Sequence, residues 1–466
     1  MTLNPDEARA AAEVAGTSEQ RRQVRKAALA STIGTTIEWY DYFLYGTAAA
    51  LVFPDLFFPN SSHYVGVLES FGTYFVGFVA RPIGAAIFGH YGDRIGRKYT
   101  LIVTLLLMGI STTLIGVMPG KSSWGDAAPI ILILLRVLQG LAVGGEWSGS
   151  VLLSMEWGNQ RRRGLMGSWP QLGVAIGLIL ATALMALFNS VAGKDGFVSW
   201  GWRIPFLLSL VLVAIGLYIR LRILETPMFA KLVESKKVEK TPVIEVIKRY
   251  PKEILLSALV RMSEQMPFYI VTAFVLSYLT DSDHGFTRNF VLVGTLIAAG
   301  IEFFLVPYFG HLSDSVGRKK VYLIGAAVMG VWGFAYFALL DSGVGWLVFV
   351  AVCLGLIPHA IQYGPQASLI AESFPTGLRY AGAGLGYQLS SVIAGGPAAL
   401  IATWLIHTFG TGYAVSIYIL ISALITIAAC MAMKEYSGSD IANDETYARQ
   451  PRDPRQSLPD RPVATR

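Results

Sequence analysis

A short basic turn occurs twice in this chain of 466 residues. Residues 89–98 read GHYGDRIGRK and residues 310–319 read GHLSDSVGRK, so glycine, aspartate, glycine, arginine and lysine recur at identical spacing. Each copy lies between two apolar runs. Glycines let two helix ends approach closely, and an aspartate can cap the N-terminus of the helix that follows. The repeat therefore predicts two equivalent halves, each with a charged turn between apolar helices.

The first copy matches a known loop signature. It resembles the loop between the second and third helices of the major facilitator superfamily, and the second copy resembles the degenerate repeat of that loop, with Ser315 replacing the first arginine. The resemblance covers residues 27–434. It implies an all-α membrane protein of twelve transmembrane helices in two pseudo-symmetric six-helix halves, a transporter and not an enzyme. It also implies a conformational latch, made of Gly89, Asp93, Arg94, Gly96, Arg97, Lys98, Gly310, Asp314, Gly317 and Arg318.

The apolar content agrees with a membrane protein. Hydrophobic residues make up 53% of the chain and charged residues 15%, which is not the balance of an ordinary soluble protein. A run of about 20 apolar residues is long enough to cross a bilayer. The predicted spans are 27–52, 67–90, 99–118, 128–154, 164–188, 201–221, 252–280, 288–311, 319–340, 344–370, 378–408 and 411–434.

These spans divide the chain into five parts. We expect an N-terminal tail at 1–26, six-helix halves at 27–221 and 251–434, a linker at 222–250 and a disordered, proline-containing tail at 435–466. The chain has no basic stripe interleaved with aromatic residues, so we expect no nucleic-acid partner. Its two cysteines lie inside apolar runs and have no metal-ligand spacing, so we expect no metal and no cofactor.

The positions of lysine and arginine predict the orientation. Cytoplasmic loops of membrane proteins carry an excess of these residues. With both termini inside, most of the 37 lysines and arginines fall in cytoplasmic segments. The exceptions are Lys121, Lys194, Arg203 and Arg288 in outer loops and Arg81, Arg136 and Arg261 within helices. We therefore expect a multi-pass protein of the inner (plasma) membrane with cytoplasmic termini.

Ionisable residues within the spans are the candidates for function. A charged side chain at the centre of a spanning helix costs about 2.5 kcal/mol or more, so it needs a partner or a role. In the first span Glu38, Asp41, Tyr42 and Tyr45 follow helical spacing and share one face. We expect this face to line a central cavity, the alternative being that Glu38 only pairs with a structural arginine.

The fourth and seventh spans carry similar groups. Arg136 and Gln139 lie in a segment that resembles the superfamily's helix-four motif, which the resemblance links to proton transfer, and Glu146 lies further along the same face. The two basic turns start at residues 89 and 310, an offset of 221 residues. Subtracting this offset from Arg261 and Glu264 in the seventh span gives positions 40 and 43, beside Glu38 and Asp41. Both halves are therefore predicted to place charge at matching depth.

One further pair is related by the repeat. Arg81 and Glu302 each lie eight residues before the basic turn of their half and have opposite signs, so they are expected to face one another. Counting Glu302, five buried acids face three buried arginines, a net charge of −2 if all were ionised. Burial and like charge raise the pKa of a carboxyl, so at least one acid is expected to bind a proton. For His359, both a structural role and a relay role remain open.

These considerations assign roles to the candidates. Arginine cannot release its proton and can bind a carboxylate through two hydrogen bonds. We predict substrate binding by Arg136, Arg261, Arg81, Tyr42, Gln139 and Gln362. We predict proton coupling by Glu38, Asp41, Glu146 and Glu264.

Four further segments narrow the family. Residues 38–42 (EWYDY), 80–84 (ARPIG), 144–147 (GGEW) and 375–380 (PTGLRY) resemble the signatures of the metabolite:proton symporters. This group includes carriers of shikimate, 2-oxoglutarate, citrate and other carboxylates, and also of proline and betaines. The nearest similarity is to the shikimate-type members.

The expected protein is a monomeric secondary transporter that brings a small organic acid into the cell with protons by alternating access. The alternatives are symport of a zwitterion such as proline or a betaine, export by proton exchange, and a membrane sensor built on a transporter scaffold. The tails are too short and featureless for a signalling domain, which disfavours the sensor.

Overall fold

The computed structural model describes residues 18–61, 63–222, 226, 241–280 and 285–447, and these ranges form helices without strands. The first half contains α2 (Ser18–Leu51), α3 (Phe53–Phe57), α4 (His63–Ile95), α5 (Arg97–Val117), α6 (Lys121–Trp124), α7 (Ala127–Trp157), η1 (Gln160–Arg162), α8 (Arg163–Gly196), η2 (Phe197–Gly201) and α9 (Arg203–Leu221). The second half contains α12 (Pro251–Val260), α13 (Met262–Tyr269), η3 (Ile270–Phe274), α14 (Val275–Thr280), α15 (Arg288–Val316), α16 (Arg318–Leu340), α17 (Gly345–Leu354), α18 (Ile357–Ala371), η4 (Thr376–Leu378), α19 (Arg379–Ser390), η5 (Ser391–Gly395), α20 (Gly396–Phe409) and α21 (Gly412–Ala432). A short helix, α11 (Pro242–Arg249), precedes the second half, and η6 (Asp444–Tyr447) follows it.

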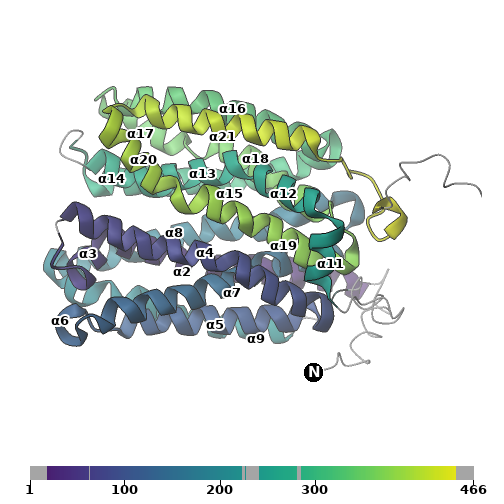
Figure 1. Cartoon of the computed structure of the whole chain (residues 1–466), viewed down its shortest axis with the longest axis horizontal. Helices are drawn as coiled ribbons and strands as arrows, with labels where there is room; N and C mark the ends of the chain where they lie inside the picture. The colour runs from purple at the N-terminus through teal and green to yellow at the C-terminus, as the bar shows by residue number, and fades with distance from the viewer. Residues whose placement is uncertain (1–17, 62, 223–225, 227–240, 281–284, 448–466) are drawn as a thin grey trace, which may run out of the picture.

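The two halves form two bundles that lie against each other along the long axis of the molecule. The purple and blue helices of Figure 1 belong to the first half, and the green and yellow helices to the second. One end carries the α4–α5 and α15–α16 turns, η1 and α11; we call it the basic end. The other end, which carries α3, α6 and α14, is called the opposite end.

The twelve predicted spans all correspond to helical segments. Ten helices of the described part are long and apolar enough to cross a membrane. The remaining two spans are α2, which is rich in polar residues and begins at Ser18 rather than at 27, and the seventh span, which is divided among α12, α13, η3 and α14. The twelve-helix architecture is confirmed.

The seventh span is interrupted where its charged residues lie. Arg261 separates α12 from α13, Pro267 lies inside α13, and the π-helical turn η3 follows. Proline removes one backbone hydrogen bond, and π turns occur often at functional sites. The irregular backbone therefore coincides with the polar centre of the second half.

The C-terminal segment is ordered as far as residue 447. Arg379 Nη2 donates to the carbonyl of Ile441 at 2.7 Å, and the hydroxyl of Tyr447 donates to the carbonyl of Glu372 at 3.1 Å. The side chains of Ile441 and Tyr447 are buried. The prediction of disorder from residue 435 is therefore wrong for 435–447, because guanidinium groups bind the backbone and aromatic side chains pack. Residues 448–466, and most of the predicted N-terminal tail and linker, lie outside the described residues.

Candidate functional site

Arg136 lies in a cage of three tyrosine rings. Its Cζ atom is 4.7 Å from the ring centre of Tyr42, 4.3 Å from that of Tyr45 and 4.8 Å from that of Tyr74. Nη1 donates to Oε1 of Gln139 at 3.2 Å. Nε and Nη2 are buried and have no hydrogen-bond partner among the described residues. The aromatic faces offset the charge of Arg136, but two nitrogen atoms remain available for a ligand.

A second guanidinium lies against the same tyrosine. Arg81 from α4 is 4.4 Å from the ring centre of Tyr42 and 4.6 Å from that of Phe78. Its Nε and Nη1 atoms are likewise buried without a hydrogen-bond partner in the described part of the chain. Arg81, Arg136 and Tyr42, which were predicted to bind substrate, therefore lie together.

The two acids of α2 differ in their surroundings. Asp41 accepts hydrogen bonds from Ser209 at 2.5 Å and from Thr112 at 2.8 Å, so each of its oxygens has a partner. Glu38 is buried, and its Oε2 atom has no hydrogen-bond partner among the described residues. The charged groups that act on Glu38 are Glu146, Arg81, Arg220 and Arg261.

Glu146 forms an ion pair within its own half, with an arginine that was not among the predicted site residues. Arg220, near the end of α9, forms a buried ion pair with Glu146 Oε1. Thr104 also donates to Glu146 Oε2 at 2.9 Å and Ser150 donates to Oε1 at 3.2 Å. Glu146 therefore differs from Glu38 and Asp41, because its charge is fully compensated within its own half.

The second half contains a chain of buried charges. Arg261 Nε lies 3.2 Å from Glu264 Oε2, and the Arg261 guanidinium lies 3.3 Å from the ring centre of Tyr387. Gln366 Nε2 donates to Glu264 Oε2 at 2.5 Å. The other Glu264 oxygen lies 3.1 Å from Nε2 of His359. Arg261, unlike Arg81 and Arg136, is already paired with a carboxylate.

Two further candidate residues have partners within the second half. Gln362 bonds within its own half, where its Oε1 accepts from the hydroxyl of Ser263 at 2.5 Å. Glu302 lies 2.5 Å from Nδ1 of His359, so its partner is this histidine and not Arg81. The equivalence of positions in the repeat therefore did not translate into a contact between Arg81 and Glu302.

The two halves meet through aromatic rings at the level of these charges. Trp39 and Phe268 have ring centres 5.8 Å apart, and Tyr42 and Tyr269 have ring centres 6.0 Å apart. Tyr269 also packs edge-on against Phe78 at 5.3 Å. Arg81 and Arg136 therefore lie beside the interface between the halves, at the centre of the protein.

The predicted excess of buried acids is wrong. Glu38, Asp41 and Glu146 in the first half are matched by Arg81, Arg136 and Arg220, all of them buried. In the second half, Glu264 and Glu302 are matched by Arg261 and, when it is protonated, His359. The earlier count omitted Arg220 and His359. Each half is electrically neutral when all these groups are charged.

Aspartates of the two basic turns close the basic end reciprocally. Asp93, in the first half, accepts a hydrogen bond at 3.0 Å from the backbone amide of Ala381 at the start of α19. Asp314, in the second half, accepts from the amides of Gly164 at 2.8 Å and Leu165 at 3.0 Å at the start of α8. Each aspartate therefore caps a helix of the other half, and not the helix that follows it as expected.

Ion pairs reinforce this contact. Arg163, at the start of α8, lies 2.7 Å from Glu372, at the end of α18, and Arg318 lies 2.9 Å from Asp314. Arg379, which starts α19, lies 3.9 Å from Glu156, at the end of α7. Two of these pairs therefore join the halves. The first half supplies the arginine in Arg163–Glu372, and the second half supplies it in Arg379–Glu156.

The remaining latch residues have distinct positions. Gly96 and Gly317 begin α5 and α16 with φ angles of 109° and 105°, where other residues would be strained. Arg94 is exposed and lies 3.0 Å from His90, whereas Lys98 is buried. The remaining glycines, Gly89 and Gly310, lie where a side chain would contact Ala381 and Ser168, respectively. The side chain of Arg97 lies outside what the structure describes.

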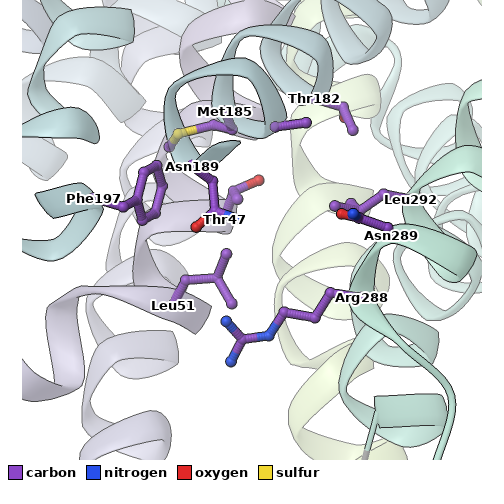
Figure 2. A pocket seen from close by; sticks show the side chains of 10 residues that line it. Thr47, Leu51, Thr182, Met185, Asn189, Phe197, Arg288, Asn289 and Leu292 are labelled. Atoms are coloured by element: carbon purple, nitrogen blue, oxygen red, sulfur yellow. The ribbon is translucent and has the colours of Figure 1, made fainter. Parts of the chain in front are cut away.

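A pocket lies between the halves at the opposite end (Figure 2). It has an empty volume of about 370 Å³, part of it open to solvent. It is lined by Thr47, Leu51, Thr182, Met185, Ala186, Asn189, Phe197, Arg288, Asn289 and Leu292. The halves are thus joined by hydrogen bonds and ion pairs at the basic end, and a pocket lies between them at the opposite end.

Curated relatives cover nearly the whole chain. A "Shikimate transporter" of Escherichia coli (strain K12) is 40% identical over 417 residues, which are 89% of this chain and 95% of that protein. The "Inner membrane metabolite transport protein YhjE" of the same strain is 41% identical over 415 residues, 88% of this chain and 94% of that protein. A "Proline/betaine transporter" of that strain is 31% identical, covering 89% of this chain and 84% of that protein.

The fold also matches solved structures. The proton:xylose symporter XylE bound to 6-bromo-6-deoxy-D-glucose superposes with a TM-score of 0.74 over 92% of this chain and 99% of that one, at 17% sequence identity. The family model described as Major Facilitator Superfamily matches residues 32–396. By this match and by the identity to its relatives, the chain belongs to the Major Facilitator Superfamily and is a metabolite transporter that spans the membrane several times.

Proposed function

We propose that this transporter moves a small organic carboxylate of the shikimate type together with a proton across the inner membrane. The observation that carries the proposal is the pair of buried guanidinium groups, Arg81 and Arg136, which both lie against the ring of Tyr42 and have nitrogen atoms without a hydrogen-bond partner among the described residues. Buried polar groups are normally hydrogen-bonded, so unpartnered ones require an explanation. A bound carboxylate would supply the missing acceptors.

The residue types support an anionic substrate. A guanidinium presents its N–H groups in a planar fork that matches a carboxylate, and charge-assisted hydrogen bonds of this kind are the strong ones. Tyr42 and Tyr269 add flat apolar surface on either side of the interface between the halves. A small ring that carries one carboxylate fits this combination. The similarity to proteins named as shikimate and metabolite transporters supports the same substrate class.

Charge balance supports coupling to a proton. The central charged groups counted above sum to zero in each half, so a bound carboxylate adds one uncompensated negative charge in a medium of low dielectric. A carboxylate that binds Arg136 also weakens the compensation of Asp41, on which Arg136 acts. Proton binding to Asp41 or Glu38 restores neutrality. The organic acid and the proton would then cross together, with Glu264 as the corresponding acid of the second half.

Alternating access completes the proposal. In this proposal the basic end and both termini face the cytoplasm, because cytoplasmic loops carry an excess of lysine and arginine. Substrate would enter from the opposite end, and the halves would then rock about the central site and break the reciprocal contacts of Asp93 and Asp314. One chain supplies all these residues, so we propose a monomer with the proton as its coupling ion and no cofactor.

A zwitterionic substrate is the second candidate. The similarity to a protein named as a proline/betaine transporter favours it, because a quaternary ammonium could pack on the tyrosine rings. A zwitterion adds no net charge to the neutral centre, so charge balance would require no proton. Export by proton exchange and a sensor function are further alternatives that the same assay separates.

Transport into proteoliposomes tests the proposal. We expect an inward proton gradient to drive accumulation of a radiolabelled organic acid, and unlabelled carboxylates to compete while proline and betaine do not. Competition by betaine alone would transfer the proposal to the zwitterion. Ligand binding without any flux would contradict transport.

A further inference from the structure

His359 joins three helices of the second half. Its ring extends from α18, with Nε2 lying 3.1 Å from Oε1 of Glu264 on α13 and Nδ1 lying 2.5 Å from Oε1 of Glu302 on α15. The ring packs against Phe268 and Tyr363, each with a centroid 4.7 Å away. His359 is 1% exposed. Both ring nitrogens therefore face a carboxylate in a site closed to water.

This geometry sets the number of protons in the cluster. An ionised carboxylate only accepts hydrogen bonds, and a neutral imidazole has a single N–H group. Two N···O contacts on opposite sides of one ring therefore require two protons. Either the imidazole is doubly protonated between two carboxylates, or a neutral imidazole bonds to one carboxylate and one carboxylic acid. Both arrangements contain the same protons and give the three groups a net charge of −1.

The neighbouring charges favour this two-proton state. Arg261 binds Glu264, so the four groups together are neutral. The other titratable groups packed around the cluster are Tyr363 on α18 itself, Tyr322 on α16, which contacts Gln366, and Tyr387 on α19, which contacts Arg261. Losing one proton would leave these four groups with a net charge of −1. In one of the two contacts, an imidazole nitrogen without a proton would then face a carboxylate oxygen. That contact would then break, which would remove one link between α18 and α13 or between α18 and α15.

We propose that the His359–Glu264–Glu302 cluster is a second proton-binding site of the transport cycle, which holds its extra proton while the basic end is closed and releases it when that end opens. The inference rests on the proposed carboxylate–proton symport. It adds a proton in the second half to the one on Asp41 or Glu38 in the first. One carboxylate with two protons carries a net charge of +1. Uptake should then respond to membrane potential as well as to the pH gradient.

The test uses a charge-balanced variant in proteoliposomes. His359→Gln together with Glu302→Gln removes the site, keeps the Arg261–Glu264 pair and leaves the second half neutral. Uptake of a radiolabelled carboxylate is measured with a pH gradient alone and with an inside-negative potassium diffusion potential alone. A tenfold potassium gradient can drive about tenfold accumulation of a species with one positive charge. We expect both forces to stimulate the natural protein, and only the pH gradient to stimulate the variant.

Two controls make the outcome decisive. His407→Gln replaces an exposed histidine on α20 and should respond to both forces as the natural protein does. Exchange of labelled for unlabelled substrate at equal pH reports folding, and the variant should retain it. Loss of exchange would overturn the proposal, because the cluster would then be structural.

Two other results would overturn only this inference. One is a natural protein that ignores the potential, and the other is a variant that keeps the full response to it. Either would leave symport driven by the pH gradient intact. A natural protein that ignores the pH gradient as well would overturn the proposed function itself.

Discussion

The Nε atom of Arg163 lies 2.7 Å from Oε1 of Glu372, and this buried ion pair joins the first residue of α8 to the residue that follows α18 in the other half. Arg318 shares the same carboxylate oxygen at 3.3 Å. The contact must break whenever the halves separate at the basic end. Its strength therefore contributes directly to the preference for the closed arrangement.

Glu372→Gln is expected to favour opening of the basic end. Removing one partner of a buried ion pair costs about 3–5 kcal/mol, because the other charge remains buried. A cysteine introduced at Ser148, which is buried in α7 beside Gly384 of α19, should react faster with a small thiol reagent. Glu245→Gln is the matched control, since the side chains of its pair with Arg249 are partly exposed, Glu245 to 23% and Arg249 to 56%. Equal labelling of both variants would contradict the role of Glu372.

Arg136→Lys should weaken substrate binding by about tenfold or more, equivalent to about 1.4 kcal/mol. A lysine keeps the charge but loses the planar fork and the stacking on Tyr42, Tyr45 and Tyr74. The dissociation constant can be measured by equilibrium binding to purified protein. Arg203→Lys is the control, because Arg203 donates to the carbonyl groups of Gly116 and Met118 at the C-terminal end of α5, away from the proposed site. Unchanged affinity in Arg136→Lys would remove Arg136 from the substrate site.

Asp41→Asn is expected to abolish accumulation driven by the pH gradient while substrate exchange persists. An amide cannot bind the coupled proton, but it has nearly the same shape and can still bond to Ser209 and Thr112. Uptake and exchange are compared in the same proteoliposomes, with Asp126→Asn, an exposed residue paired with Lys121, as control. If Asp41→Asn still concentrates substrate in step with the gradient, the proton is bound elsewhere.

Glu146→Gln should destabilise the fold without altering the response to pH. It leaves the buried Arg220 unpaired, at a cost of about 3–5 kcal/mol. The double variant Glu146→Gln with Arg220→Gln should recover most of this loss, as measured by thermal unfolding in detergent. A stable Glu146→Gln protein with lost proton coupling would restore the role that the sequence analysis assigned to Glu146.

Truncation after Glu435 should loosen the basic end. Arg163 donates at 3.1 Å to the carbonyl groups of Tyr436 and Ser439, and the deletion removes both acceptors. We expect a lower unfolding temperature and faster labelling of a cysteine at Ser148. Truncation after Tyr447 keeps these contacts and serves as the control. Identical behaviour of the two truncations would show that residues 436–447 are dispensable.

Much of the fold could be predicted because the bilayer imposes a simple rule on sequence. Each span must be apolar over about 20 residues, so runs and basic loops identify helices and their order. The failure at the C-terminus has an equally simple cause. Proline and charge suggested disorder, but buried arginines bind the carbonyl groups of Tyr436 and Ile441 and the hydroxyl of Tyr447.

The site was only partly predictable. Helical spacing placed Asp41 and Tyr42 on one face, but periodicity does not reveal which residues of other helices reach that face. Ser209 and Thr112, which bind Asp41, are hydroxyl residues inside apolar runs, and that pattern was the available signal. Arg220 was missed because it lies at the end of its span, where a loop position is equally plausible from sequence.

Asp93 and Asp314 each cap a helix of the other half, and this determines which residues at the basic end can be substituted. Their partners are main-chain amides of Ala381, Gly164 and Leu165, and every amino acid except proline provides that group. What these aspartates recognise is thus a helix terminus, and not a particular side chain. At Ala381, Gly164 and Leu165, substitution by a residue other than proline is limited by the space available for the side chain. Each aspartate can therefore keep its hydrogen bond when the residue that donates it is replaced.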